Sequence, residues 1–125
     1  NNDKIAIVNE FDGIRISNIY HYIMMNYHNQ LTLEQIAKEA NMTPQAFCSY
    51  FKKRTSKTFI AFLNEVRIHE ACHRLTSNDF DFISDVGFKC GFNTITHFNR
   101  VFKSIKGISP TDYRSKYLGL VNSDA

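Results

Sequence analysis

The stretch that decides the fold runs from Phe59 to Leu75 and reads FIAFLNEVRIHEACHRL. It contains no glycine or proline and follows Thr58, a typical N-cap residue, so it predicts one uninterrupted helix. At about 100° per residue, its apolar side chains form two clusters on roughly opposite sides: Phe59, Phe62, Leu63 and Val66, then Ile68, Ala71, Cys72 and Leu75. A helix on a single core would keep one apolar stripe. We therefore predict a connecting helix of about 25 Å whose halves pack on two small cores.

The composition of the chain indicates an all-helical protein. Its 125 residues provide one modest domain or two very small ones, and they include only two prolines and five glycines. Three scattered cysteines, Cys48, Cys72 and Cys90, argue against a disulfide framework and for a reducing compartment. The sequence has no signal peptide and no apolar run long enough to span a membrane, which predicts a cytoplasmic protein.

Basic residues are concentrated in two segments, one on each side of the connecting helix. Neither segment contains an acid: residues 43–57 carry Lys52, Lys53, Arg54 and Lys57, and residues 86–111 carry Lys89, Arg100, Lys103 and Lys106. Because the net charge of the whole chain is only +3, the rest of it is acidic. Two positive segments on an acidic body favour a polyanionic partner; the alternative is that they are ordinary solvated helix faces.

A helix-turn-helix pattern precedes the connecting helix. A short amphipathic helix containing Ala37 leads to Asn41, one of the few residues other than glycine that accept a left-handed turn conformation. Thr43 and Pro44 then suit the N-cap and first position of a second helix, which runs to about Arg54. The small side chain of Ala37 lets the two helices cross closely, as this motif requires.

The same pattern returns about 50 residues later. At an offset of 50, the residues Ile36, Ala37, Ala40, Asn41 and Met42 align with Val86, Gly87, Cys90, Gly91 and Phe92. With one more residue inserted, Phe47, Phe51, Lys52, Thr58 and Phe62 align with Phe98, Phe102, Lys103, Ser109 and Tyr113. This internal repeat predicts a second helix-turn-helix, with Gly91 in the left-handed turn and either Asn93 or Thr94 as the cap.

The remaining segments complete the predicted organisation. A supporting helix spans about Ser17 to His28, Thr32 and Gln35 form a capping box, and a last helix begins at Ser109-Pro110. The predicted division is a loosely ordered segment with a turn at Asp12-Gly13 (1–13), a first helix-turn-helix subdomain (14–58), the connecting helix (59–75), a second subdomain (76–118) and a tail (119–125).

The residues from 14 to 118 resemble the DNA-binding domain of the AraC family of bacterial transcription regulators. The most specific match comprises Gly91-Phe92-Asn93-Thr94, Phe98, Arg100, Phe102-Lys103, Gly107-Ile108-Ser109-Pro110 and Tyr113-Arg114. The sequence departs from the family in having Asn41 where glycine is frequent and Gly87 where alanine is usual. Asn41 tolerates the turn, whereas Gly87 lowers helix propensity by up to about 1 kcal/mol.

The resemblance implies sequence-specific binding of double-stranded DNA, with two recognition helices in successive major grooves on one DNA face. It also implies a separate effector or dimerisation domain, normally N-terminal, and RNA polymerase as a further partner. No cofactor and no metal are expected, and the expected location is the cytoplasm, in association with the nucleoid.

The first recognition helix is expected to read bases and to hold phosphates through its outward side. The resemblance assigns base reading to Gln45, Cys48 and Ser49. The amide of Gln45 suits adenine, whereas Ser49 is a permissive contact and Cys48 offers only a weak or apolar one. Lys52 and Lys53 are expected to bind phosphate.

The second recognition helix is expected to present Ile95, Thr96, His97, Asn99, Arg100 and Lys103 outward. An exposed Ile95 suits a thymine methyl group, Asn99 suits adenine, and Arg100 suits either guanine or phosphate. Lys103 is expected to bind phosphate. The caps Thr43 and Thr94 stand at helix N-termini, where backbone N–H groups favour phosphate.

Two other functions compete with DNA binding. The run from His69 to His73 fits H-E-x-x-H, in which His69, Glu70 and His73 would form the ligands and base of a zinc hydrolase. A chance match on the connecting helix is the simpler interpretation, so no enzyme activity is predicted. The second alternative is a helical protein-interaction module built on the many aromatic residues, but most of these fall at inward positions.

Overall fold

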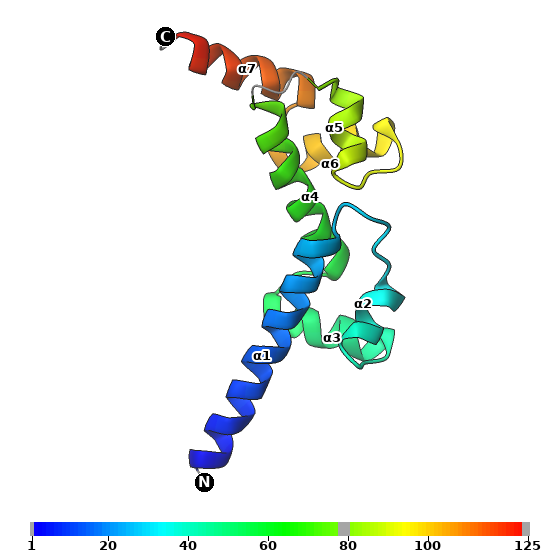
Figure 1. Ribbon diagram of the computed structural model, residues 1–125, viewed down its shortest axis with the longest axis vertical. Helices are drawn as coiled ribbons and strands as arrows, with labels where there is room; N and C mark the ends of the chain where they lie inside the picture. Colours follow the sequence, from blue (N-terminus) through cyan, green and yellow to red (C-terminus); the bar gives the residue numbers. More distant parts are fainter. Residues whose placement is uncertain (1, 78–80, 124–125) are drawn as a thin grey trace. The chain divides into compact units, whose positions relative to one another are not determined.

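The computed structural model describes residues 2–77 and 81–123, with side chains described for residues 10–77 and 81–118. Within these ranges the structure is all-helical (Figure 1). The helices are α1 (Asn2–Asn26), α2 (Leu33–Glu39), α3 (Pro44–Thr55), α4 (Phe59–Leu75), α5 (Ile83–Lys89), α6 (Ile95–Lys106) and α7 (Pro110–Ser123). None of these helices has the length and hydropathy that a membrane span needs. The predicted all-α class is confirmed.

Local capping determines where most of the helices begin. In each of five caps, a side-chain oxygen accepts a hydrogen bond of 3.1 to 3.2 Å from the backbone N–H three residues later: Thr32, Thr43, Thr58, Thr94 and Ser109. At Thr32 the capping box is complete, because its own N–H donates to Gln35 Oε1 at 2.9 Å. Of the two candidate caps for α6, the structure selects Thr94.

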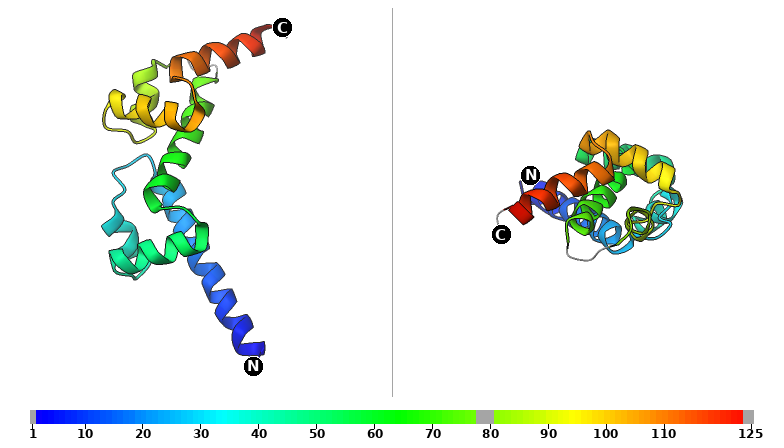
Figure 2. Two further views of the ribbon diagram at one scale, coloured as in Figure 1. Left: turned by 180° about the vertical axis from the view of Figure 1, so that it is seen from behind. Right: turned by 90° about the horizontal axis from the view of Figure 1, so that it is seen from above.

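Two left-handed residues close the two helix-turn-helix turns, as predicted. Asn41 has φ 58° and Gly91 has φ 105°. In both turns the N–H of the following residue bonds back to the carbonyl of the small residue: Met42 to Ala37 at 2.9 Å, and Phe92 to Gly87 at 3.0 Å. Short turns therefore join α2 to α3 and α5 to α6 (Figures 1 and 2).

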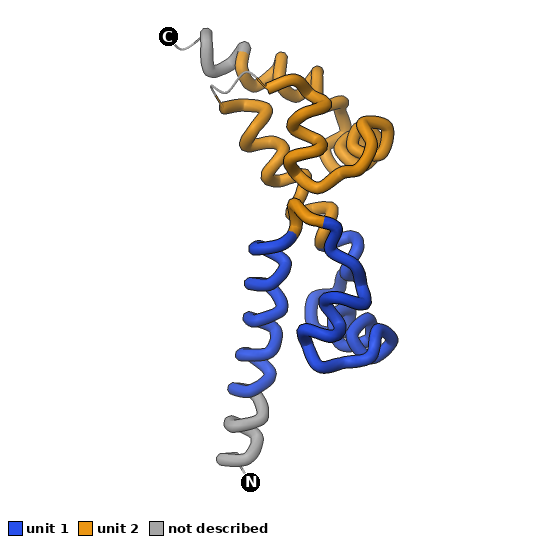
Figure 3. Tube along the Cα trace, turned by 45° about the vertical axis from the view of Figure 1, so that its right-hand side comes forward, with its two compact units in different colours: residues 1–26, 30–62 blue, residues 27–29, 63–125 orange. Residues whose placement is uncertain are grey.

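The chain forms two compact units that divide within α4 (Figure 3). Unit 1 contains the chain up to Asn26 and residues 30–62, and unit 2 contains residues 27–29 and the chain from Leu63 onward. The helix predicted for 59–75 thus contributes its start to one unit and most of its length to the other. The repeat of the sequence corresponds to these two units.

Aromatic rings form the core of unit 1. Phe51 packs against Phe47 with ring centroids 5.6 Å apart, and against Phe62 at 5.5 Å. Phe59 contacts Phe47 at 5.8 Å, and Tyr20 of α1 stacks on Phe62 at 5.3 Å. The first half of α4 therefore provides two rings to the core that also buries α3.

Unit 2 repeats this arrangement at the positions that the sequence repeat predicts. Phe102 packs against Phe98 at 5.8 Å and against Tyr113 at 5.4 Å, as Phe51 does against its two partners. The second half of α4 completes this core with Ile68, Ala71, Cys72 and Leu75, all buried. The predicted change of side along α4 is confirmed by this packing.

A buried arginine binds the segment 27–29 within unit 2. Arg67 Nε donates to the carbonyl of Tyr27 at 2.8 Å, and its Nη2 donates to the carbonyl of Asn29 at 2.9 Å. The guanidinium also lies 5.8 Å from the ring centroid of Phe92. A Cβ atom at Gly91 would lie 2.7 Å from Arg67 Nε, so glycine provides the space as well as the turn. Burial lowers the pKa of Arg67, but an arginine remains protonated in proteins.

The turn predicted at Asp12-Gly13, at the end of the segment expected to be loosely ordered, is wrong, because both residues lie inside α1. Aspartate and glycine are poor helix formers, but each costs only about 1 kcal/mol or less inside a helix. Contacts of Asp12 with Tyr50 and Arg54 of α3 supply a tertiary reason for the helix to continue through this point.

The helix end predicted near Gly119, where the tail was expected to begin, is also wrong, since α7 continues to Ser123. One glycine lowers helix propensity without blocking the backbone hydrogen bonds, and no proline follows it. The helix therefore extends past the position at which the sequence pattern indicated a stop.

Gly87 provides a test of close helix packing. A Cβ atom there would lie 2.7 Å from Phe98 Cδ2 and 2.8 Å from Cγ, inside the buried core. We expect Gly87→Ala to lower the free energy of unfolding by about 1 to 3 kcal/mol through overpacking, despite the better helix propensity of alanine. Urea unfolding measures this change.

Gly13 is the matched control, because it lies in α1 and a Cβ atom added to it would meet no other atom within 4 Å. Gly13→Ala should raise the free energy of unfolding by about 0.5 to 1 kcal/mol. If Gly87→Ala were equally stabilising, the steric interpretation of this position would be wrong.

Candidate nucleic-acid interface

The predicted contact residues of α3 share one exposed side of that helix. Its buried side is formed by Phe47 and Phe51. The opposite side presents Gln45, Cys48, Ser49, Lys52 and Lys53, all of which are exposed. The first candidate surface therefore combines short polar groups near the start of the helix with positive charge toward its end.

The second candidate surface lies on α6 and is smaller than predicted. Thr96, Asn99, Arg100 and Lys103 are exposed. His97 is only half-exposed, because its ring packs 5.5 Å from the ring of Phe92.

The prediction that Ile95 is exposed is wrong. Its side chain is partly buried and packs against the core of unit 2. The spacing explains this, because Ile95 precedes the buried Phe98 by three residues and Phe102 by seven, which places all three on one side of the helix.

The N-termini of α3 and α6 have the electrostatic character predicted for phosphate contacts. Neither helix has an acid in its first turn, whereas both have basic residues in the last turn. The caps Thr43 and Thr94 are exposed, so the N–H groups around them lie at the surface. A helix N-terminus of this kind favours a nearby anion.

Ion pairs neutralise part of the positive charge that the sequence places in the two basic segments. Arg54 Nε lies 2.9 Å from Asp12 Oδ2, and Lys89 Nζ lies 3.0 Å from Asp81 Oδ2. Sequence reasoning missed the first pair because its partners belong to α1 and α3, far apart in the chain. The charge available for a polyanion is therefore more concentrated than the sequence indicates.

The H-E-x-x-H residues are engaged in ordinary helix contacts. Glu70 Oε1 lies 3.5 Å from Arg74 Nε, one turn later in α4, and the rings of His69 and His73 lie 5.9 Å apart. In the part of the chain that the structure describes, no group of three or more His, Cys, Asp or Glu residues could hold a metal ion.

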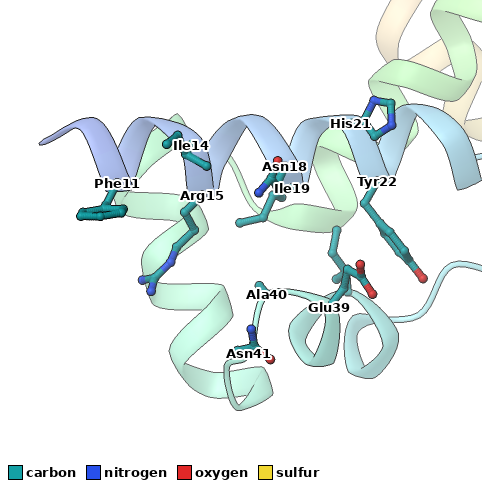
Figure 4. A pocket seen from close by; sticks show the side chains of 11 residues that line it. Phe11, Ile14, Arg15, Asn18, Ile19, His21, Tyr22, Glu39, Ala40 and Asn41 are labelled. Carbon is teal, nitrogen blue, oxygen red and sulfur yellow. The ribbon is translucent and has the colours of Figure 1, made fainter. Parts of the chain in front are cut away.

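A groove of about 530 Å³ lies within unit 1, between α1 and α2 (Figure 4). Phe11, Arg15 and Tyr22 of α1 line one side of it, while Glu39 and Asn41 line the other. None of the predicted base-reading residues lines this groove. It is therefore separate from the candidate interface.

These two units, each with an exposed polar and basic helix after a tight turn, define a helix-turn-helix DNA-binding protein of the double type. A family model described as a helix-turn-helix domain matches residues 36–116. The chain belongs to this family, the helix-turn-helix domain of the AraC type.

Relatives and solved structures agree with this assignment. The MmsAB operon regulatory protein of Pseudomonas aeruginosa is 30% identical over 104 residues, which cover 83% of this chain and 34% of that protein. The C-terminal domain of AraT, a response regulator from Geobacillus stearothermophilus, is 27% identical with a TM-score of 0.76, covering 82% of this chain and 84% of that one. The DNA-binding domain of AdpA, solved with a target DNA, is 25% identical with a TM-score of 0.75, covering 81% and 90%.

The chain spans only a part of its curated relatives, between 13% and 36% of the lengths of those compared. The similarity therefore concerns the helix-turn-helix domain of those proteins.

The exposure of the three thiols gives a direct test of this surface. Cys48 is exposed, whereas Cys72 and Cys90 are buried. Burial raises the pKa of Cys90 to about 11 and also raises the pKa of Cys72, so both thiols are protonated and shielded at neutral pH. We expect a maleimide to label one thiol in the folded protein and three after unfolding, as counted by mass spectrometry. Cys48→Ser should abolish labelling of the folded protein; rapid labelling of that variant would contradict the packing of unit 2.

Proposed function

We propose that the chain binds double-stranded DNA sequence-specifically, as the DNA-binding part of a bacterial transcription regulator, with α3 and α6 as its two recognition helices. The observation that carries the proposal is the repetition of one geometry. Each unit has a left-handed turn, a threonine-capped helix and an exposed polar and basic side on that helix. Placement of the two helices in successive major grooves is part of the proposal and follows the family resemblance.

Base reading is assigned to the side chains whose hydrogen-bonding groups match base edges. Gln45 and Asn99 carry amides that can pair with adenine, and Arg100 carries a guanidinium that can pair with guanine. Ser49 and Thr96 supply permissive hydroxyl contacts. Cys48 offers a weak or apolar contact and His97 is only half-exposed, whereas Ile95 packs on the core and is not retained as a reader.

Phosphate binding is assigned to side chains that carry positive charge and to the caps at two helix N-termini. Lys52, Lys53 and Lys103 are exposed on the same helices as the readers. Thr43 and Thr94 place helix N-termini at the surface. Contacts of this kind supply affinity and register without reading sequence.

The proposal assigns no catalytic role to the chain. Its further partners, an effector or dimerisation domain and RNA polymerase, are those that the family resemblance implies. The short span of this chain within its relatives supports the first of these, because most of each relative lies outside the matched region.

Selection of bound duplexes from a random library, at two salt concentrations, tests the function. We expect enrichment of a site with two short blocks about one helical turn apart. Binding at low salt without any enriched sequence would contradict sequence-specific recognition.

Alanine substitutions distinguish phosphate ligands from readers. Lys52→Ala or Lys103→Ala should weaken binding to every duplex and lower the log–log salt slope by about one unit. Gln45→Ala or Asn99→Ala should relax preference at one or two base pairs by about 1 to 3 kcal/mol, leaving the slope unchanged. A uniform loss of affinity for all sequences in Gln45→Ala would exclude its role as a reader.

Protection of Cys48 tests whether the exposed side of α3 meets DNA. We expect the selected duplex to slow maleimide labelling of Cys48, because the thiol lies among the proposed readers. Glu10→Cys in a Cys48→Ser background is the control, since Glu10 is exposed on α1 and α1 packs against the other side of α3. Equal labelling of Cys48 with and without the selected duplex would show that this side of α3 stays open to solvent.

A further inference from the structure

A four-residue cluster joins α1 to α3 on the side of α3 that faces away from its proposed readers. Tyr50 Oη donates to Asp12 Oδ1 at 2.7 Å, and Arg54 Nε lies 2.9 Å from Asp12 Oδ2. One carboxylate thus binds two residues that stand one turn apart on α3. The guanidinium of Arg15, also from α1, lies 5.7 Å from the ring centroid of Tyr50.

The cluster is better suited to fixing a position than to adding stability. The side chain of Arg54 is 44% exposed and that of Asp12 is 33% exposed, and ion pairs this close to solvent contribute little to stability. Its geometry is nevertheless restrictive, because both carboxylate oxygens are used and the tyrosine is held at its hydroxyl and at its ring. Burial and the bond to Asp12 raise the pKa of Tyr50, so its hydroxyl stays neutral and able to donate.

The position of the cluster on the helix connects it with base reading. With 3.6 residues per turn, Tyr50 and Arg54 lie beside the buried Phe47 and Phe51, while Gln45 and Ser49 lie on the opposite side. The aromatic core packs against one side of α3, through Phe47 and Phe51. The cluster fixes the adjacent side, which carries Tyr50 and Arg54, to α1. Recognition tolerates errors of only about 0.5 Å and 10–20° in the supporting geometry. A rotation of α3 about its axis would carry its readers out of hydrogen-bonding distance of the bases.

We propose that Asp12 is a positioning residue for DNA recognition, which sets the rotation of α3 through Tyr50 and Arg54. The inference rests on the proposed role of α3 as a recognition helix. It assigns Arg54 to this cluster and not to a DNA phosphate, although Arg54 lies in a basic segment of the sequence. Loss of the cluster should therefore affect the sequence preference of one recognition helix and leave the other unchanged.

The test uses the duplex selected by the unmodified chain and its single-base-pair variants. The Gln45→Ala and Asn99→Ala variants first assign one block of the site to α3 and the other to α6. Discrimination at a block is the ratio of the affinity for the selected duplex to the affinity for a duplex with one base pair of that block changed. It is then measured for Asp12→Ala and for Tyr50→Phe, which keeps the ring and removes only the hydroxyl. Glu10→Ala, which removes an exposed acid from the same helix, is the matched control.

We expect Asp12→Ala and Tyr50→Phe to lower discrimination at the α3 block by about fivefold to tenfold, comparable to the loss of one base contact. Discrimination at the α6 block, and both blocks in Glu10→Ala, should be unchanged. Arg54→Met should lower discrimination at the α3 block while preserving the log–log salt slope.

Three results would overturn the proposal while leaving the proposed function intact. The first is unchanged discrimination in both Asp12→Ala and Tyr50→Phe. The second is an equal loss of discrimination at both blocks in these variants, together with a lower melting temperature. The third is a log–log salt slope reduced by about one unit in Arg54→Met. The second would indicate a general structural role, and the third would make Arg54 a phosphate ligand. Failure of the unmodified chain to enrich any sequence would instead refute the proposed function, and this inference with it.

Discussion

The close crossing of two short helices is the constraint on which each unit depends. In both turns, a backbone N–H just after a left-handed residue bonds to the carbonyl of a small residue in the preceding helix: Met42 to Ala37, and Phe92 to Gly87. That bond forms only where the helices approach closely, and a larger side chain would separate them. The glycine is the stricter case, because even a methyl group would meet the ring of Phe98. The direction of α3 and α6, and so of every proposed DNA contact, follows from these turns.

Arginines complete the structure where helices end. Arg67 binds the carbonyls of Tyr27 and Asn29 just after α1, and Arg114 of α7 binds the carbonyl of Leu75 at 3.0 Å, at the end of α4. The last carbonyls of a helix lack partners within it and carry partial negative charge, so the guanidinium of Arg114 is well placed to bind the carbonyl of Leu75. Within unit 2, these bonds hold residues 27–29, and they add a polar contact at the end of α4 to the apolar packing of its second half.

The basic side chains divide into those that pair with an aspartate and those that lie on the proposed recognition surfaces. Arg54 and Lys89 belong to the basic segments of the sequence, yet each is paired with an aspartate. Lys52, Lys53 and Lys103 are exposed on the sides of α3 and α6 that carry the proposed readers. The net charge of +3 is thus a poor guide to the interface, since its distribution over helix faces determines what a polyanion would meet.

The sequence by itself determined the features that depend on neighbours within about four residues. The capped starts of the helices, the left-handed turns and the span of α4 follow from local hydrogen bonds and helical periodicity, and the internal repeat identified both units. Only the tertiary structure decided that α1 continues through Asp12-Gly13 and that Arg54 faces Asp12. The contacts responsible join different helices, as Tyr50 joins Asp12 across 38 residues. No local pattern encodes such a contact, because it exists only once the cores have brought the helices together.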